Sequence, residues 1–140
     1  MREQPSAAEL IDAVAEFITG DIAPTLTGRL AFHARVAANV LAIVGRELEL
    51  GPAADRADAA RLAALLGTEG EPAALTEELC RRIEAGEIAA DDPALIDHLW
   101  ATTLATLAVD QPGYATYRRI VADQESRTDQ ETSADKGDRS

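Results

Sequence analysis

The side chains best suited to binding or catalysis form a polar stripe on an otherwise apolar helical pattern. Arg35, Asn39 and Arg46 recur at helical spacing, and at about 100° per residue they fall on one narrow line. Guanidinium groups bind carboxylates and phosphates through a planar fork of donors, so this stripe is a candidate ligand groove. The alternatives are a solvated stripe whose arginines pair with acids and a contact face for a partner protein.

His33 lies on the apolar face of the same pattern. We predict a core histidine held by a hydrogen bond, with a ligand-pocket or proton-transfer role as the alternative. His98 is predicted to be a solvated surface residue. Metal ligation by the two histidines is disfavoured, because nothing in their spacing fixes a coordination site.

The catalytic inventory is thin. The sequence contains no HExxH, phosphate-loop, dinucleotide-binding or GxSxG motif. We therefore expect no catalytic residues, no metal and no cofactor, and a non-enzyme more than an enzyme.

A long helix over residues 27–50 must position these side chains, and Gly51-Pro52 is expected to end it. Large apolar residues cover about half of its circumference. They are predicted to form the core, so Val40→Asp is expected to unfold the domain. Trp100, on a later helix, is predicted to be core as well, with a partner anchor as the alternative. A second stripe of small residues is expected to pack within the domain or across a homodimer: Ala31, Ala34, Ala38, Ala42 and Gly45.

Capping signals and breakers predict shorter helices on both sides of the long one. Ser6 and Glu9 have capping-box spacing, and Asp92 followed by Pro93 marks another start. The fold class is therefore all-α, a compact bundle of five or six helices around the long central helix (about 27–50), in one domain over residues 1–122. Residues 123–140 lack large apolar side chains and are predicted to be a disordered acidic and polar tail. The other helices are predicted at 6–20, 52–67, 72–85, 93–110 and 114–122.

Composition narrows the partners and the compartment. The formal net charge of −12 repels phosphate backbones and disfavours nucleic-acid binding. The single Cys80 excludes an internal disulfide and fits a reducing cytoplasm. No signal peptide or apolar run of membrane-spanning length is apparent, so a cytoplasmic protein without a membrane partner is expected.

Three segments together resemble a bacterial domain-of-unknown-function family. They are GRLAFHARVAANVLAIVGRELELGP, LCRRIEAGEI and DPALIDHLWATTLATLAVDQPGY, at residues 28–52, 79–88 and 92–114. Near the end of the last segment, Thr106 stands where the family usually has lysine, and Gln111 where it has asparagine. The residues that match the family pattern are Arg35, Asn39, Arg46, Glu47, Pro112 and Tyr114.

The resemblance implies an accessory role beside aminoglycoside-phosphotransferase-like kinases or acyl-CoA dehydrogenases, with no catalytic residues to transfer. We therefore expect a helical interaction module that works with one of these proteins. The alternative is a small-ligand-binding domain or minor enzyme for an acyl or phosphorylated compound, using Arg35, Asn39 and Arg46 with His33 nearby.

Overall fold

The computed structural model describes residues 4–137, with side chains as far as Gln130. Within this range it contains five α-helices and no strand, so the all-α prediction is confirmed. Two short segments, the π-helical η1 (Ile18–Ile22) and the 3-10 turn η2 (Ala23–Thr25), join the first two helices. None of the described helices is long and apolar enough to cross a membrane.

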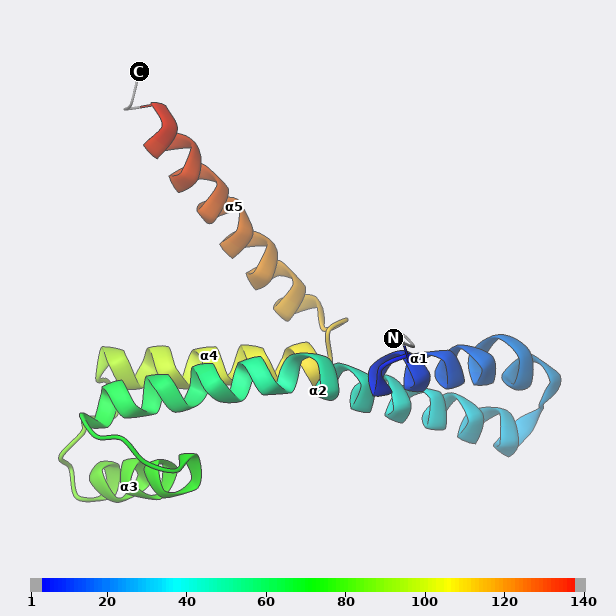
Figure 1. The fold of residues 1–140 in the computed structure, drawn as a ribbon, viewed down its shortest axis with the longest axis horizontal. Coiled ribbons are helices and arrows are strands. Elements are labelled where there is room, and N and C mark those ends of the chain that lie inside the picture. Colours follow the sequence, from blue (N-terminus) through cyan, green and yellow to red (C-terminus); the bar gives the residue numbers. More distant parts are fainter. Residues whose placement is uncertain (1–3, 138–140) are drawn as a thin grey trace.

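The long helix α2 (Gly28–Leu66) organises the arrangement (Figure 1). The prediction of a long central helix is confirmed, but its predicted end at Gly51-Pro52 is wrong. The helix continues for 39 residues and absorbs the separate helix expected at 52–67. It ends at Gly67, whose left-handed φ of 68° suits glycine and turns the chain so that Thr68 N–H, like Gly67 N–H, donates to Ala63 O.

Contacts from α4 (Pro93–Asp110) explain why the helix persists through Pro52. Arg46 Nε donates to Val109 O at 2.6 Å on one side of the proline. On the other side, Thr102 Oγ1 donates to Asp58 Oδ1 at 2.6 Å. The antiparallel α4 therefore spans the position where proline removes one backbone hydrogen bond, and it holds the two halves of α2 in line.

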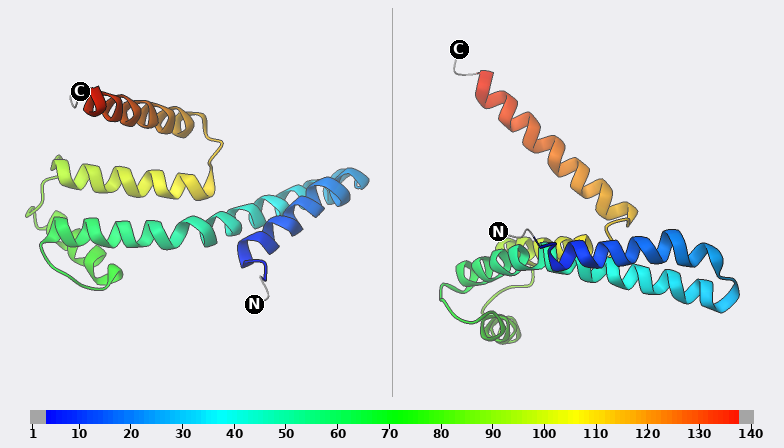
Figure 2. Two further views of the ribbon diagram at one scale, coloured as in Figure 1. Left: turned by 45° about the horizontal axis from the view of Figure 1, so that its top comes forward. Right: turned by 45° about the vertical axis from the view of Figure 1, so that its right-hand side comes forward.

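The first helix, α1 (Ala7–Phe17), lies antiparallel against the first half of α2 (Figures 1 and 2). Its predicted capping box is confirmed: Ser6 N donates to Glu9 Oε2 at 2.7 Å, and Glu9 N donates to Ser6 Oγ at 3.2 Å. Hydrogen bonds with Ser6 lower the pKa of Glu9; the bond with the Ser6 backbone has the larger effect, and the bond with its side chain has the smaller one. Gly20 does not end this helical segment, because η1 and η2 carry the turn on to Leu26.

Small residues of α2 make the close approach of α1 possible. Ala31, Ala38 and Gly45 are buried, and a Cβ added to Gly45 would lie 2.9 Å from Asp12 Oδ1. The structure thus uses the predicted small-residue stripe for packing within the chain.

The buried leucine core lies where the second half of α2 meets α3 (Pro72–Glu84) and α4. The Asp92 side chain starts α4 as predicted, accepting from Ala94 N at 2.9 Å and Leu95 N at 3.2 Å. Leu62 is the most deeply buried of the core residues, with 1% exposed. The core residues are Leu62, Leu66, Leu75, Leu79 and Leu95.

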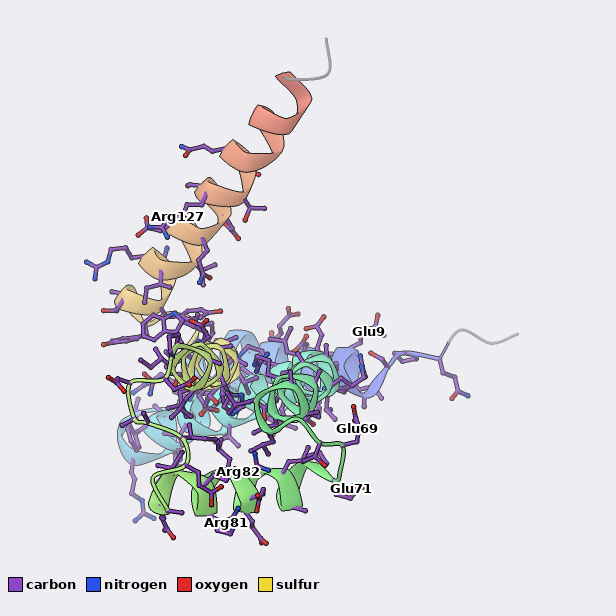
Figure 3. The ribbon with its side chains drawn as sticks, turned by 90° about the vertical axis from the view of Figure 1, so that its left-hand side faces the viewer. Glu9, Glu69, Glu71, Arg81, Arg82 and Arg127 are labelled. Carbon is purple, nitrogen blue, oxygen red and sulfur yellow. The ribbon has the colours of Figure 1, made fainter. Side chains whose placement is uncertain are left out.

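The last helix, α5 (Ala115–Gly137), projects away from the other helices (Figure 1 and the right panel of Figure 2). In the segment predicted to be a disordered tail, residues 123–137 are part of this helix. The side chains from Ala122 to Gln130 are all exposed. Arg127 lies on this segment, apart from the other helices (Figure 3). The predicted domain boundary at residue 122 stays a prediction, and residues 138–140 lie outside the described range.

Candidate functional site

The structure brings together two of the four predicted site residues. Arg35 and Asn39 line a groove of about 630 Å³ between α1 and α2. Two acids of α1, Asp12 and Glu16, line the same groove. Arg35 therefore stands near carboxylates of its own chain, and an anionic ligand in this groove would meet their repulsion.

Arg46, the third member of the stripe, has a structural contact instead. Its guanidinium is part-buried and donates to Val109 O in the last turn of α4. A cationic donor at a helix C-terminus satisfies a carbonyl that has no partner within the helix. The side chain that the helical period places beside Asn39 is thus directed to another helix.

His33 lies on a different side of α2, about 120° around the helix from Asn39. The prediction that it is a core histidine is wrong: His33 is exposed, and its ring contacts that of Phe32 edge-on at 5.6 Å. The reason is that α1 covers the small-residue side of α2 and leaves the side of His33 open.

A polar cluster that the sequence did not predict joins α2 to α4. Asp58 Oδ1 accepts hydrogen bonds from Thr102 Oγ1 at 2.6 Å and from Arg61 Nη2 at 3.1 Å. His98 Nδ1 lies 3.8 Å from the same oxygen, and His98 is only 6% exposed. The prediction of a solvated His98 is therefore wrong, because α4 turns this residue onto α2.

Only the spacing of these residues in the sequence could have indicated this cluster. Asp58 and Arg61 are three positions apart on one helix, and His98 and Thr102 are four apart on the other, so each pair shares a face. Helical spacing cannot show that the two faces meet, since that depends on how α4 packs.

A groove of about 340 Å³ adjoins the cluster. Four acids and one arginine line it, so its charge suits a cationic group more than an anionic one. Among the residues that the structure describes, no group of three or more His, Cys, Asp or Glu is arranged to hold a metal ion. The charged lining residues are Glu47, Asp55, Asp58, Asp110 and Arg61.

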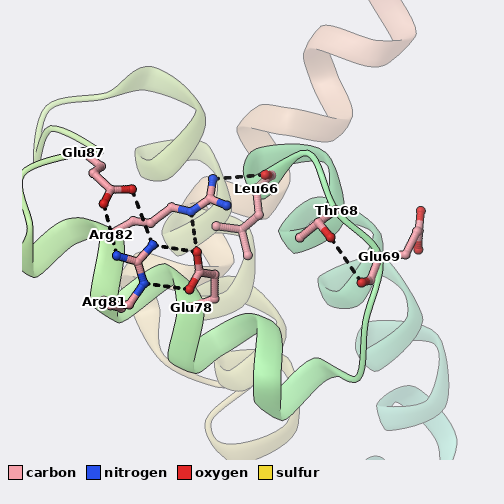
Figure 4. Close-up of polar contacts among 7 residues, drawn as sticks. All are labelled: Leu66, Thr68, Glu69, Glu78, Arg81, Arg82 and Glu87. Carbon is pink, nitrogen blue, oxygen red and sulfur yellow. Dashed lines mark hydrogen bonds and ion pairs between the residues drawn. The ribbon is translucent and has the colours of Figure 1, made fainter.

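A second polar network ties α3 to the end of α2 (Figure 4). Glu78 accepts from Arg81 Nε at 2.8 Å and from Arg82 Nε at 2.7 Å. The hydrogen bonds from Arg81 and then Arg82 lower the pKa of Glu78 to about 2. Arg82 Nη1 also donates to Leu66 O at 3.1 Å and so satisfies a carbonyl at the end of α2, whereas Arg81 lies on the outer side of α3 (Figures 3 and 4).

Large apolar side chains are exposed on two separate surfaces. On α4, Ile96, Leu99 and Trp100 are 49%, 51% and 51% exposed, so the prediction of a core tryptophan is wrong. On α2, the predicted core residue Val40 is 50% exposed, and the expected unfolding by Val40→Asp loses its basis. Similarly exposed residues of the α1–α2 hairpin include Leu10, Val14, Phe17, Leu30, Val36, Val44 and Leu48.

The fold and these surfaces define an all-α module with extensive exposed apolar area. The chain belongs to the family described as "Domain of unknown function (DUF6285)", whose model matches residues 24–114. The match includes α2, α3 and α4. Comparison with curated proteins found no match, and comparison with solved structures found none either.

Proposed function

We propose that this chain is a non-enzymatic, cytoplasmic interaction module that binds a partner protein through one face of α4. The observation that carries the proposal is the exposure of Ile96, Leu99 and Trp100. Their spacing of three and four residues places all three on one helix face.

A tryptophan flanked by aliphatic side chains is the type of anchor that dominates binding energy at protein interfaces. Large side chains on one helix face also fit the recognition mode in which a helix packs into an apolar groove of its partner. The module would therefore present α4, held in place on α2 by the Asp58 cluster, to the other protein.

The partner class follows from the family resemblance. We propose a phosphotransferase-like kinase or an acyl-CoA dehydrogenase, next to which related domains are expected to occur. Family membership supports the domain assignment, and the exposed α4 face supports binding of a protein.

Fluorescence tests this proposal directly, because Trp100 is the only tryptophan of the chain. A tryptophan-free variant of each candidate partner, encoded by a neighbouring gene, is titrated into the chain. A shift of Trp100 emission to shorter wavelength is expected, and Trp100→Ala should weaken binding measured by calorimetry at least about 30-fold.

Tyr114→Ala is the matched control, since Tyr114 is an aromatic residue of 49% exposure outside this face. It should leave the affinity within about twofold of that of the unchanged chain. Absence of both binding and an emission shift at about 100 micromolar, for both partner classes, would overturn the proposal.

The alternative function is binding of a small acyl or phosphorylated compound by Arg35 and Asn39; it is the weaker candidate, because Asp12 and Glu16 line the same groove and repel anions. Inorganic phosphate and butyrate are suitable probes, with chemical-shift changes of the Arg35 and Asn39 signals as the readout. Arg35→Gln should abolish these changes. Shifts that survive this substitution, or that never appear, would remove the candidate.

A further inference from the structure

We propose that a second copy of this chain covers one flank of the α1–α2 hairpin, so that two hairpins form a four-helix bundle. The inference concerns a different surface from the α4 face and does not depend on the partner proposed above.

Helical geometry gives the hairpin two unlike flanks. The groove with Asp12, Glu16, Arg35 and Asn39 marks the polar flank. At about 100° per residue, large apolar side chains of both helices fall on the opposite side. We call this the apolar flank; its members are Leu10, Val14 and Phe17 of α1 and Leu30, Val44 and Leu48 of α2.

These side chains are exposed to an extent that is unusual for large apolar residues on two packed helices. Leu30 is 62% exposed, Phe17 55% and Leu10 54%. Val14, Leu48 and Val44 are 49%, 47% and 40% exposed. A contiguous apolar surface of this kind on a water-exposed chain indicates an interface.

The chain exposes more surface than a folded monomer of its mass usually does. A folded monomer of 14.8 kDa exposes about 7000 Å² by the usual scaling with mass, whereas this chain exposes 10403 Å². The excess is about 3400 Å². The projecting α5 and the half-exposed apolar residues of α1, α2 and α4 share this excess, which is about four times the roughly 800 Å² that each partner contributes to a standard interface.

If two copies meet, their charge pattern favours this position over the rest of the surface. The net charge of −12 makes most surfaces of two copies repel each other. No acidic or basic residue of 7–17 or 28–48 falls in the sector of the apolar flank, so two copies meet there with the least repulsion. A two-fold axis pairs each flank with its identical counterpart, and two-helix hairpins that pair in this way form a four-helix bundle.

The first experiment is sedimentation equilibrium of the full chain from about 1 to about 100 micromolar. A mass of 29.6 kDa, twice the chain mass of 14.8 kDa, is expected at the upper end. A mass of 14.8 kDa throughout would overturn the proposal and would leave the flank to another segment or another protein.

The second experiment locates the interface. A variant with Val14→Asp and Val44→Asp should raise the dimer dissociation constant at least about a hundredfold, because four carboxylates would be buried in the bundle. Ile96→Asp is the matched control, since Ile96 and Val14 are both 49% exposed but lie on different surfaces. It should leave the dissociation constant unchanged.

A dimer that survives the double substitution, or that the control dissociates equally, would show that the copies meet elsewhere. If the aspartate variant does not fold, Val14→Thr with Val44→Thr gives the answer, because threonine keeps the side-chain shape. It should raise the dissociation constant about tenfold, and an unchanged constant would overturn the proposal.

Discussion

The two halves of α2 are buried in different ways. The second half meets α3 and α4 through leucines, of which Leu62 and Leu95 are 1% and 2% exposed. The first half meets α1 through alanine and glycine, and α1 has no fully buried residue. Leu30 and Val40 in that half remain 62% and 50% exposed.

This difference separates the part of α2 that stabilises the monomer from the part that we propose to bind a second copy. Apolar burial stabilises a folded chain roughly in proportion to the area removed from water, so the leucine core supplies most of the stability of the monomer. The first half of α2 keeps much of its apolar area exposed, and this is where we propose that a second copy binds. One continuous helix therefore combines a folding core with a proposed interaction surface.

A matched pair of aspartate substitutions gives the largest expected contrast between the halves. Leu62→Asp places a carboxylate in the leucine core and should cost more than about 4 kcal/mol, enough to unfold the chain. Val40→Asp should cost less than about 1 kcal/mol, because the carboxylate remains hydrated. Urea denaturation followed by circular dichroism measures both, and equal losses would contradict the contrast.

The close contact of α1 with α2 can be tested at Gly45. Gly45→Leu should destabilise the chain by about 2 kcal/mol, since the added side chain displaces Ile11 and Asp12. Gly45→Ala should be neutral or stabilising, because Asp12 Oδ1 can rotate away and alanine favours the helix by about 1 kcal/mol. Thermal melts report both changes, and a loss for Gly45→Ala as large as that for Gly45→Leu would show that α1 cannot adjust.

Removing the hydrogen bonds between α2 and α4 should reduce the stability of the chain by a similar or slightly smaller amount than Gly45→Leu. Asp58→Ala removes the acceptor shared by Thr102 and Arg61 and should cost about 2 kcal/mol. Asp55→Ala, an exposed acid of the same groove, should change the free energy of unfolding by less than about 0.5 kcal/mol. Chemical denaturation at neutral pH compares the two variants, and equal changes would mean that the cluster adds nothing.

The smallest effect concerns pH and the α3 network. The pKa of Glu78 is lowered from 4.5 to about 2 by its hydrogen bonds to Arg81 and Arg82. Its contribution to stability is therefore complete above pH 4.5 and is lost as the pH falls through about 2. Glu78→Gln should flatten this part of the stability profile, whereas Glu77→Gln at the neighbouring exposed position should not. Identical profiles for both variants would assign the acid sensitivity to other groups.

Local signals in the sequence predicted much of the fold. Ser6, Asp92 and Gly67 begin or end helices as expected, because capping depends on residues a few positions apart. The small-residue stripe predicted close packing for the same reason. The break at Pro52 was wrong because its tolerance depends on α4, which is distant in the sequence.

The candidate site was harder to predict. The helical period placed Arg35 beside Asn39 but could not reveal that Arg46 binds Val109 O, 63 residues away. The apolar pattern likewise showed that Val40 and His33 lie on an apolar side of α2, but not whether any part of the same chain covers that side. Burial of His98 depends on its meeting Asp58 across two helices.

Pro52 also gives α2 a point at which the helix can bend. Proline has no N–H for the carbonyl of Leu48, so the helix is least stiff at this point. From Pro52 to Gly28 the helix is about 36 Å long, and a bend of about 10° at the proline would swing the α1 end through about 6 Å. Breaking the contact of α4 with Arg46 or with Asp58 would therefore allow the α1–α2 hairpin, at the other end of α2, to move.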